Sequence, residues 1–318
     1  MKKKQIYIHL GFPKTASTYL QSNIFPHMKG AIYLGKPFGN TISMLEKKIL
    51  KLNETQYEQE KKDLINSLEK IFNKSNNKYI LSHEGFLRCT RYNELDNPIS
   101  NNIFQTLKRL DEIFSNYCEV NFIIVLRKYD KMLRSYFTQF HRGFKFEYNE
   151  YNFLKDLREN KTEKNILKNF YYGEIINFIE KLKINYKVLI YEDLKNNPKV
   201  YHQELFNFIG INIDYKNQIF NSTEINFLDK YIFHNIKKIL SSYRKGVLLK
   251  KIFKLSSYMV LIKQTFKIKG LVKVDNFFTN PSFSNKYKKE IFNFYVTDFY
   301  KLPKNIQIKC EKNNYLEN

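Results

Sequence analysis

Short apolar segments of strand length alternate with longer segments of helical spacing along the first two thirds of the chain. The clearest apolar segment is 120–126, VNFIIVL, which is rich in β-branched residues and carries no charge. This composition is typical of a strand buried on both faces of a parallel sheet. Four further strands are expected at 5–10, 31–35, 78–82 and 186–191. Such alternation builds right-handed βαβ units, so we expect an α/β fold with a parallel sheet and helices on both faces.

Helices are expected where apolar residues recur at helical intervals between these strands. The segments with this spacing are 18–28, 42–72 (one or two helices), 103–114, 130–141, 164–182 and 197–209, the last followed by Gly210 as its cap. Beyond about residue 225 the strand pattern ends and basic, helix-like sequence follows. There is no internal repeat and no Pro- or Gly-rich linker. We therefore expect a single domain, 1–318, with a core at 5–211 and a helical, basic C-terminal extension at about 225–318.

The charge balance of the chain is strongly basic, with 54 Lys and Arg against 31 Asp and Glu and a net charge of +23. Such an excess favours polyanionic partners, although a composition rich in Lys, Asn, Ile, Phe and Tyr also results from an AT-rich genome. No helix-turn-helix, zinc-binding or RNA-binding pattern accompanies the charge. A nucleic-acid partner is therefore not expected.

Cysteine usage and the N-terminus both favour a cytoplasmic protein. The three cysteines, Cys89, Cys118 and Cys310, are odd in number and form no CxxC pair, which argues against a disulfide scaffold or a structural zinc site. The basic residues 2–4 are not followed by a long apolar run, so no signal peptide is expected. No stretch approaches the roughly 18 uncharged apolar residues of a membrane span.

The segment 6–20, IYIHLGFPKTASTYL, predicts an anion-binding loop between a strand and a helix. A loop that opens on Gly11 and feeds a helix N-terminus presents several main-chain N–H groups and the positive end of the helix dipole to one point. Lys14 adds a charge, and the hydroxyl groups of Thr15, Ser17 and Thr18 add donors. A phosphate- or sulfate-like anion would fit such a pocket.

The same segment departs from the phosphate-binding loop of nucleotide hydrolases and kinases, GxxxxGK[ST]. Counted from Gly11, that pattern requires Gly at 16 and Lys at 17, whereas the chain has Ala16 and Ser17. The lysine stands only three residues after the glycine. A P-loop-type kinase or nucleotide hydrolase that acts on a small molecule is retained as the alternative function.

In this loop the chain resembles the sulfotransferases that use 3′-phosphoadenosine-5′-phosphosulfate (PAPS). GFPKTAST, 11–18, is similar to the family's 5′-phosphosulfate loop, GxPKTGTT. The resemblance implies a P-loop-like α/β fold, PAPS as the donor without a required metal, and donor binding by five loop residues: Lys14, Thr15, Ala16, Ser17 and Thr18. Ala16 stands where the family usually has glycine, which tightens the space for backbone approach.

Two further motifs follow in the family's order. At 123–136, IIVLRKYDKMLRSY, a buried strand ends at Arg127 and Ser135 comes eight residues later, and the resemblance implies that both bind the 3′-phosphate. A guanidinium suits bidentate contact with a phosphate. The third, 191–211, YEDLKNNPKVYHQELFNFIGI, looks like an architectural segment of the family. The resemblance covers residues 5 to about 211.

A general base is expected where the strand 78–82 ends in His83-Glu84. Members of the family often place a catalytic Glu or His after this strand, and S-x-E is similar to saccharide-modifying members. Glu84 is favoured over His83, and both are retained. An acidic residue with an ordinary pKa of ~4.3 would need desolvation to act as a base near neutrality. Lys14 is the other expected catalytic residue, because it can stabilise the charge on the leaving oxygen.

The stretch 230–274 contains twelve Lys or Arg residues and no Asp or Glu. Its basic, amphipathic pattern is typical of a helix on an anionic membrane surface, and also of a basic wall for an acidic acceptor. Ordinary bundle helices of AT-biased composition give the same pattern. The expected acceptor is a hydroxyl- or amine-bearing molecule, with a polysaccharide or lipid-linked glycan as the leading candidate.

Overall fold

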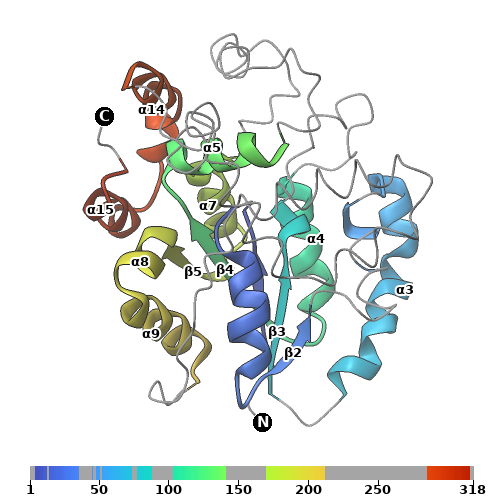
Figure 1. Cartoon of the computed structure of the whole chain (residues 1–318). Coiled ribbons are helices and arrows are strands. Elements are labelled where there is room, and N and C mark those ends of the chain that lie inside the picture. The colour runs from blue at the N-terminus through green and yellow to red at the C-terminus, as the bar shows by residue number, and fades with distance from the viewer. Residues whose placement is uncertain are drawn as a thin grey trace, which may run out of the picture. The chain divides into compact units, whose positions relative to one another are not determined.

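Five parallel strands form one sheet in the order β2-β3-β1-β4-β5 (Figure 1). The structure is a computed structural model that describes residues 4–12, 14–35, 45, 48–50, 52–73, 77–87, 103–140, 170–211 and 285–315. The strands are β1 (Gln5–Leu10), β2 (Ile32–Gly35), β3 (Lys78–His83), β4 (Glu119–Leu126) and β5 (Asn185–Ile190). All five strands expected from the apolar segments are present. Their parallel pairing confirms the expected sheet.

The central strand β1 pairs with β3 on one side and with β4 on the other. Every residue of β4 after Glu119 is buried, as its uncharged sequence predicted. Successive side chains of β1 alternate between two apolar layers. Ile6, Ile8 and Leu10 belong to the main core cluster, whereas the rings of Tyr7 and His9 contact Phe208 and Phe25.

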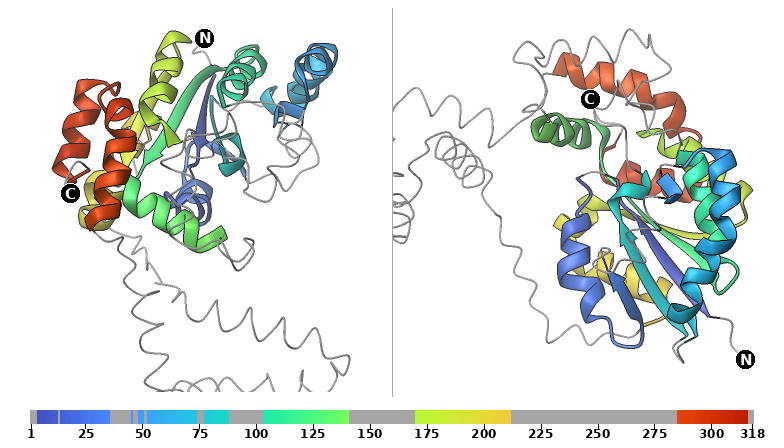
Figure 2. Two further views of the ribbon diagram at one scale, coloured as in Figure 1. Left: turned by 90° about the horizontal axis from the view of Figure 1, so that it is seen from above. Right: turned by 90° about the vertical axis from the view of Figure 1, so that its right-hand side faces the viewer.

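Helices cover both faces of this sheet, as expected (Figure 2). The helices that follow β1 to β5 along the chain are α1 (Ser17–Tyr19), α3 (Glu54–Phe72), α4 (Ile103–Phe114), α5 (Tyr129–Phe140), α7 (Tyr172–Lys181), α8 (Tyr191–Asn196) and α9 (Pro198–Ile209). α3 and α4 lie on the face opposite to α1. The predicted cap is also present, because Gly210 has the left-handed φ of 67° at the end of α9.

The helix expected at 18–28 is irregular rather than a uniform α-helix. α1 continues as a π-helical turn, η1 (Leu20–Ile24), and then as a 3₁₀ turn, η2 (Phe25–His27). Pro26 has no N–H to donate to a carbonyl four residues earlier, so a regular α-helical ladder cannot continue through it. Within the π turn, the buried Gln21 side chain donates to Ser82 Oγ at 3.0 Å.

The C-terminal part of the chain returns to the sheet as α14 (Asn285–Phe299) and α15 (Lys304–Lys312). The buried Asp298 carboxylate accepts hydrogen bonds of 3.0 Å from the main-chain N–H groups of both Gly173 and Glu174, the first turn of α7. A Cβ on Gly173 would lie 2.1 Å from the carbonyl oxygen of Asp298, so this contact requires glycine. The expected C-terminal helices are thus present at 285–312, whereas the stretch 230–274 lies outside the described residues.

Among the described helices, none is both long and apolar enough to cross a membrane.

Candidate active site

The carboxyl ends of β1, β3 and β4 meet at one edge of the sheet. Leu10, the last residue of β1, is in register with His83 at the end of β3 and with Ile124 near the end of β4. The chain leaves β1 towards β2 on one side and leaves β4 towards β5 on the other. In open α/β sheets, ligands bind at the crevice where the strand order reverses in this way. All of the residues predicted to bind the donor or catalyse transfer lie at the ends of these three strands or in the segments that follow them.

The loop after β1 has an unusual backbone conformation. Lys14 and Ala16 both take left-handed φ values, of 66° and 63°. Alternation of left- and right-handed residues turns successive N–H groups towards one concave point that binds anions. Ala16 is the position at which the sulfotransferase motif usually has glycine, and an L-residue pays roughly 1–2 kcal/mol there. Residue 16 thus has a left-handed conformation that glycine would adopt without this cost.

The three hydroxyl groups of the loop have different environments. Thr15 Oγ1 is buried and donates to the carbonyl oxygen of Phe12 at 2.8 Å, so it braces the loop from inside. Ser17 Oγ is buried and has no partner among the described residues, and Thr18 is exposed. Ala16, the N-cap of α1, offers no side-chain cap to the first N–H groups of the helix. Ser17, Thr18 and these amides therefore remain as donors for an anion.

Arg127 joins the end of β4 to the loop. Its Nη1 donates to the carbonyl oxygen of Lys14 at 2.7 Å, and its guanidinium carbon lies 4.4 Å from the ring centroid of Tyr191. Its Nε is buried and has no partner within the described part of the chain. The guanidinium is thus fixed on two sides and retains donor capacity. The sequence analysis predicted only an architectural role for the segment that begins at Tyr191. It did not predict the contact between the Tyr191 ring and Arg127.

Ser135 lies on α5, about two turns from the start of the helix. Its side chain is half-buried, and the described residues show no hydrogen bond between it and Arg127. The structure therefore brings Arg127 to the predicted loop and leaves Ser135 as a predicted ligand on the neighbouring helix. The sequence predicts that Ser135 and Arg127 both contact the 3′-phosphate, and it predicts no direct contact between them.

The two candidates for the base follow each other at the end of β3. His83 Nδ1 accepts a hydrogen bond of 2.8 Å from the main-chain N–H of Gly85, in the 3₁₀ turn η3 (Glu84–Leu87). A neutral His83 therefore carries its proton on Nε2, and its basic lone pair is occupied. In this arrangement the Nδ1 lone pair of His83 is directed at the main chain of the turn. The side chain of Glu84 lies outside the described residues.

A buried polar network lies next to the loop, between β1, β3 and the π turn. His9 Nδ1 and Ser82 Oγ are 2.8 Å apart, and Gln21 Nε2 donates to the same hydroxyl. Burial lowers the pKa of His9 to about 3, so the ring is neutral at physiological pH. Only Nδ1 of His9 has a hydrogen-bond partner, because Nε2 is buried without one among the described residues. The network anchors the helix that carries the loop's last donors.

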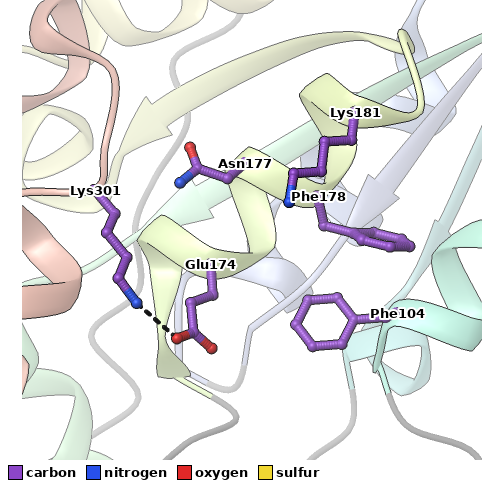
Figure 3. A pocket seen from close by; sticks show the side chains of 6 residues that line it. All are labelled: Phe104, Glu174, Asn177, Phe178, Lys181 and Lys301. Carbon is purple, nitrogen blue, oxygen red and sulfur yellow. Dashed lines mark hydrogen bonds and ion pairs between the residues drawn. The ribbon is translucent and has the colours of Figure 1, made fainter.

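A separate cavity of about 440 Å³ lies between α4 and α7 (Figure 3). Its lining residues are Phe104, Glu174, Asn177, Phe178, Lys181 and Lys301. Two of these residues, Lys301 and Glu174, form an ion pair at 2.8 Å. None of the site residues predicted from the sequence lines this cavity. Within the described residues, no group of three or more His, Cys, Asp or Glu side chains is arranged to hold a metal ion.

Comparison with known proteins finds similarity at the level of structure. No protein-family profile matches the chain, and no characterised protein matches its sequence. A sulfotransferase from Alicyclobacillus acidocaldarius is similar with a TM-score of 0.49 and 10% identity, over 95% of each chain. The sulfotransferase domain from the curacin biosynthetic pathway is similar with a TM-score of 0.35 and 15% identity, over 67% of this chain and 76% of the other. Both of these similar proteins are sulfotransferases.

Proposed function

We propose that this protein transfers a sulfuryl group from PAPS to a hydroxyl or amine of an acceptor. The observation that carries the proposal is the hydrogen bond from Arg127 Nη1 to the carbonyl oxygen of Lys14. It joins two elements that each suit an anion, an amide-lined loop and a guanidinium at a strand end. A donor with anionic groups at both its 5′ and 3′ positions would engage both elements at once.

The residues present fit such a donor. Ser17 Oγ and Arg127 Nε are buried donors without a partner in the described part of the chain, and unpaired buried donors are costly unless a ligand satisfies them. The N-terminus of α1 has no side-chain cap, which leaves its amides for an anion. We assign the 5′-phosphosulfate to Lys14, Ser17, Thr18 and the main chain of Thr15 and Ala16. Arg127 and Ser135 are assigned to the 3′-phosphate.

When bound, PAPS supplies an activated sulfuryl group, whose bond to the 5′-phosphate oxygen breaks as the acceptor oxygen attacks sulfur. Lys14 and the loop amides would stabilise the negative charge that grows on this leaving oxygen. Preorganised donors of this kind usually make the largest contribution to such a transfer. Arg127 would hold the 3′-phosphate equally in the ground and transition states, so it contributes to binding rather than to the chemical step.

Proton removal from the acceptor is assigned to Glu84. His83 is adjacent, but the Gly85 N–H occupies its Nδ1 lone pair, which argues against a role as base. The alternative, in which His83 turns to free Nδ1, requires the loss of this main-chain hydrogen bond.

The acceptor is proposed to be a polysaccharide or lipid-linked glycan, and the protein is proposed to act in the cytoplasm, at the membrane surface. The support for this is the net charge of +23 and the acid-free stretch 230–274. Polybasic segments favour anionic surfaces and anionic polymers alike. Analogy with the family supports a glycan as the acceptor. The acceptor is identified by incubation of the protein with radiolabelled PAPS and candidate glycans, followed by detection of the glycan that carries the label.

The donor assignment is tested by thermal unfolding with the desulfated product, adenosine 3′,5′-bisphosphate (PAP). A ligand that binds only the folded state stabilises it by RT ln(1 + [L]/Kd), or roughly 2.7 kcal/mol at a hundredfold excess over Kd. PAP should raise the melting temperature, whereas ATP with magnesium should not. Equal stabilisation by ATP with magnesium would favour the P-loop-type kinase or nucleotide hydrolase instead.

A further inference from the structure

The peptide group between Arg127 and Lys128 is held at both of its polar ends by side chains of two helices. Its carbonyl oxygen accepts a hydrogen bond of 3.1 Å from the hydroxyl of Tyr172 on α7. Its N–H donates to Glu192 Oε1, on α8, at 3.1 Å. The carbonyl and the N–H belong to one planar unit, so these two bonds together fix its orientation. Arg127 projects from this clamped peptide.

The side chains of Tyr172 and Glu192 thus form a clamp on this peptide. The clamp is itself held by the C-terminal end of the described chain. Glu192 Oε2 accepts a hydrogen bond of 2.9 Å from the hydroxyl of Tyr315, whose side chain is almost fully buried. The neighbouring carboxylate, Asp193 Oδ1, accepts from Asn313 Nδ2 at 2.9 Å. Both donors lie in the turn that follows α15. Glu192 thus links the turn after α15 to the turn that carries Arg127, and Asp193 adds a second contact between α8 and the turn after α15.

Tyr172, the tyrosine of the clamp, is supported by a stack of aromatic rings that extends to α14. The ring of Tyr129 stacks on Tyr172 at a centroid distance of 4.7 Å and on Tyr295 of α14 at 4.2 Å. Tyr129 is the first residue of α5, two positions after Arg127. α14 therefore reaches Tyr172 through the ring of Tyr129, and Tyr315 contacts Glu192 directly, although both contacts come from segments more than 150 residues after Arg127 in the chain.

We propose that Glu192 and Tyr315 are positioning residues that hold Arg127 for the 3′-phosphate, so that the turn after α15 contributes to donor selectivity. This inference rests on the proposed function, in which Arg127 binds that phosphate. A guanidinium binds phosphate strongly only when its planar fork is aligned, and the clamp supplies that alignment from the main chain. Loss of the clamp would leave the charge of Arg127 unchanged, but the guanidinium would no longer be aligned with the phosphate.

The test compares the Kd of PAP with that of AMP, which lacks the 3′-phosphate, by calorimetric titration of the full chain. Glu192→Ala should reduce the preference for PAP over AMP by about tenfold, and Tyr315→Phe by about threefold, because each removes hydrogen bonds of the clamp. Glu192→Gln should keep the preference within about twofold of the wild type, since its amide can accept from Lys128 N–H and donate to the Tyr315 hydroxyl. Affinity for AMP should stay unchanged in all three.

Tyr186→Phe is the matched control, because it also removes a tyrosine–glutamate hydrogen bond, that of Tyr186 to Glu180 at 2.6 Å, away from Arg127. It should leave the preference for PAP unchanged. If Tyr315→Phe and Glu192→Ala retain the wild-type preference, or lose affinity for PAP and AMP equally, the positioning role is wrong while the proposed function stands. If the wild type itself does not prefer PAP to AMP, the 3′-phosphate assignment is wrong and the inference falls with it.

Discussion

Arg127 Nη1 lies 2.7 Å from the carbonyl oxygen of Lys14 and donates a hydrogen bond to it, although 113 residues separate the two along the chain. The bond connects the turn after β4 to the loop after β1. The Lys14 side chain is exposed on the loop, whereas the Arg127 guanidinium is fixed against the loop's main chain.

Lys14→Ala should lower the turnover number by about 10²–10³ with a smaller effect on PAP affinity, because the charge that Lys14 meets develops during the reaction. Arg127→Ala should instead weaken PAP binding by about 10- to 100-fold. Lys131→Ala removes a neighbouring exposed charge on α5 and serves as the control. Steady-state kinetics and PAP titration separate the two effects. The reverse pattern would mean that the two roles are exchanged.

Glu84→Gln should reduce the turnover number by roughly 10²–10⁴ with PAP affinity unchanged, because it removes basicity and keeps shape. His83→Asn should cost much less, since Nδ1 of His83 is occupied by the N–H of Gly85. The rate of sulfuryl transfer at saturating PAP measures both. A larger loss from His83→Asn would identify the histidine as the base, and no loss from either would place the base elsewhere.

Local sequence patterns predicted the elements of this fold well. The uncharged run in β4 and the shorter apolar runs elsewhere identified all five strands, because burial in a parallel sheet requires such composition. The expected strand 186–191 ended one residue late, since Tyr191 already begins α8. The strand order β2-β3-β1-β4-β5 was not predicted, because pairing depends on contacts between segments far apart in the chain.

The site was predictable only in part for the same reason. The loop around Lys14 and the arginine at the end of β4 stand out as motifs, and the fold brings them together. The clamp by Tyr172 and Glu192 could not be predicted, because it depends on where one main-chain peptide lies relative to two other helices. The hydrogen bond to Nδ1 of His83 likewise comes from a main-chain N–H that no side-chain pattern reveals.

Ala16→Gly should raise the free energy of unfolding by about 1 kcal/mol, because glycine takes the left-handed conformation of residue 16 without strain. Lys183→Gly is the matched control, since Lys183 also has a positive φ, of 57°, in the turn between α7 and β5. Chemical denaturation of both variants measures the change. A gain for Lys183→Gly with a loss for Ala16→Gly would contradict the left-handed conformation at Ala16.

Anionic liposomes should sediment the protein at low salt if the stretch 230–274 lies on a membrane, since each lysine near such a surface contributes about 1 kcal/mol. Neutral liposomes should not, and 1 M salt should release the protein because the Debye length falls to ~3 Å. Replacing Lys250, Lys251 and Lys254 with Glu should abolish sedimentation and leave PAP binding unchanged. A wild type that ignores anionic liposomes at low salt would exclude the membrane interpretation.

The contribution of Asp298 to the stability of the protein should decrease as the pH rises from about 4 to about 6. Burial raises the pKa of this carboxyl to about 6, although the N–H groups of Gly173 and Glu174 partly oppose the shift. The unfolded chain should have an ordinary aspartate pKa of ~3.9, so between the two values the folded state binds more protons. The contribution of Asp298 to the free energy of unfolding therefore falls by up to about 3 kcal/mol across this window and is constant above it.

The measurement is urea denaturation from pH 4 to 8, with Asp298→Asn compared with the wild type at each pH. Asparagine cannot ionise, so the stability of the wild type relative to the variant should decrease from pH 4 to 6 and then level off. Asp63→Asn, on the exposed surface of α3, is the control for the removal of an aspartate. A relative stability that instead rises with pH would mean that the hydrogen bonds from α7 outweigh burial. In that case Asp298 stabilises the junction of α14 and α7 as a carboxylate.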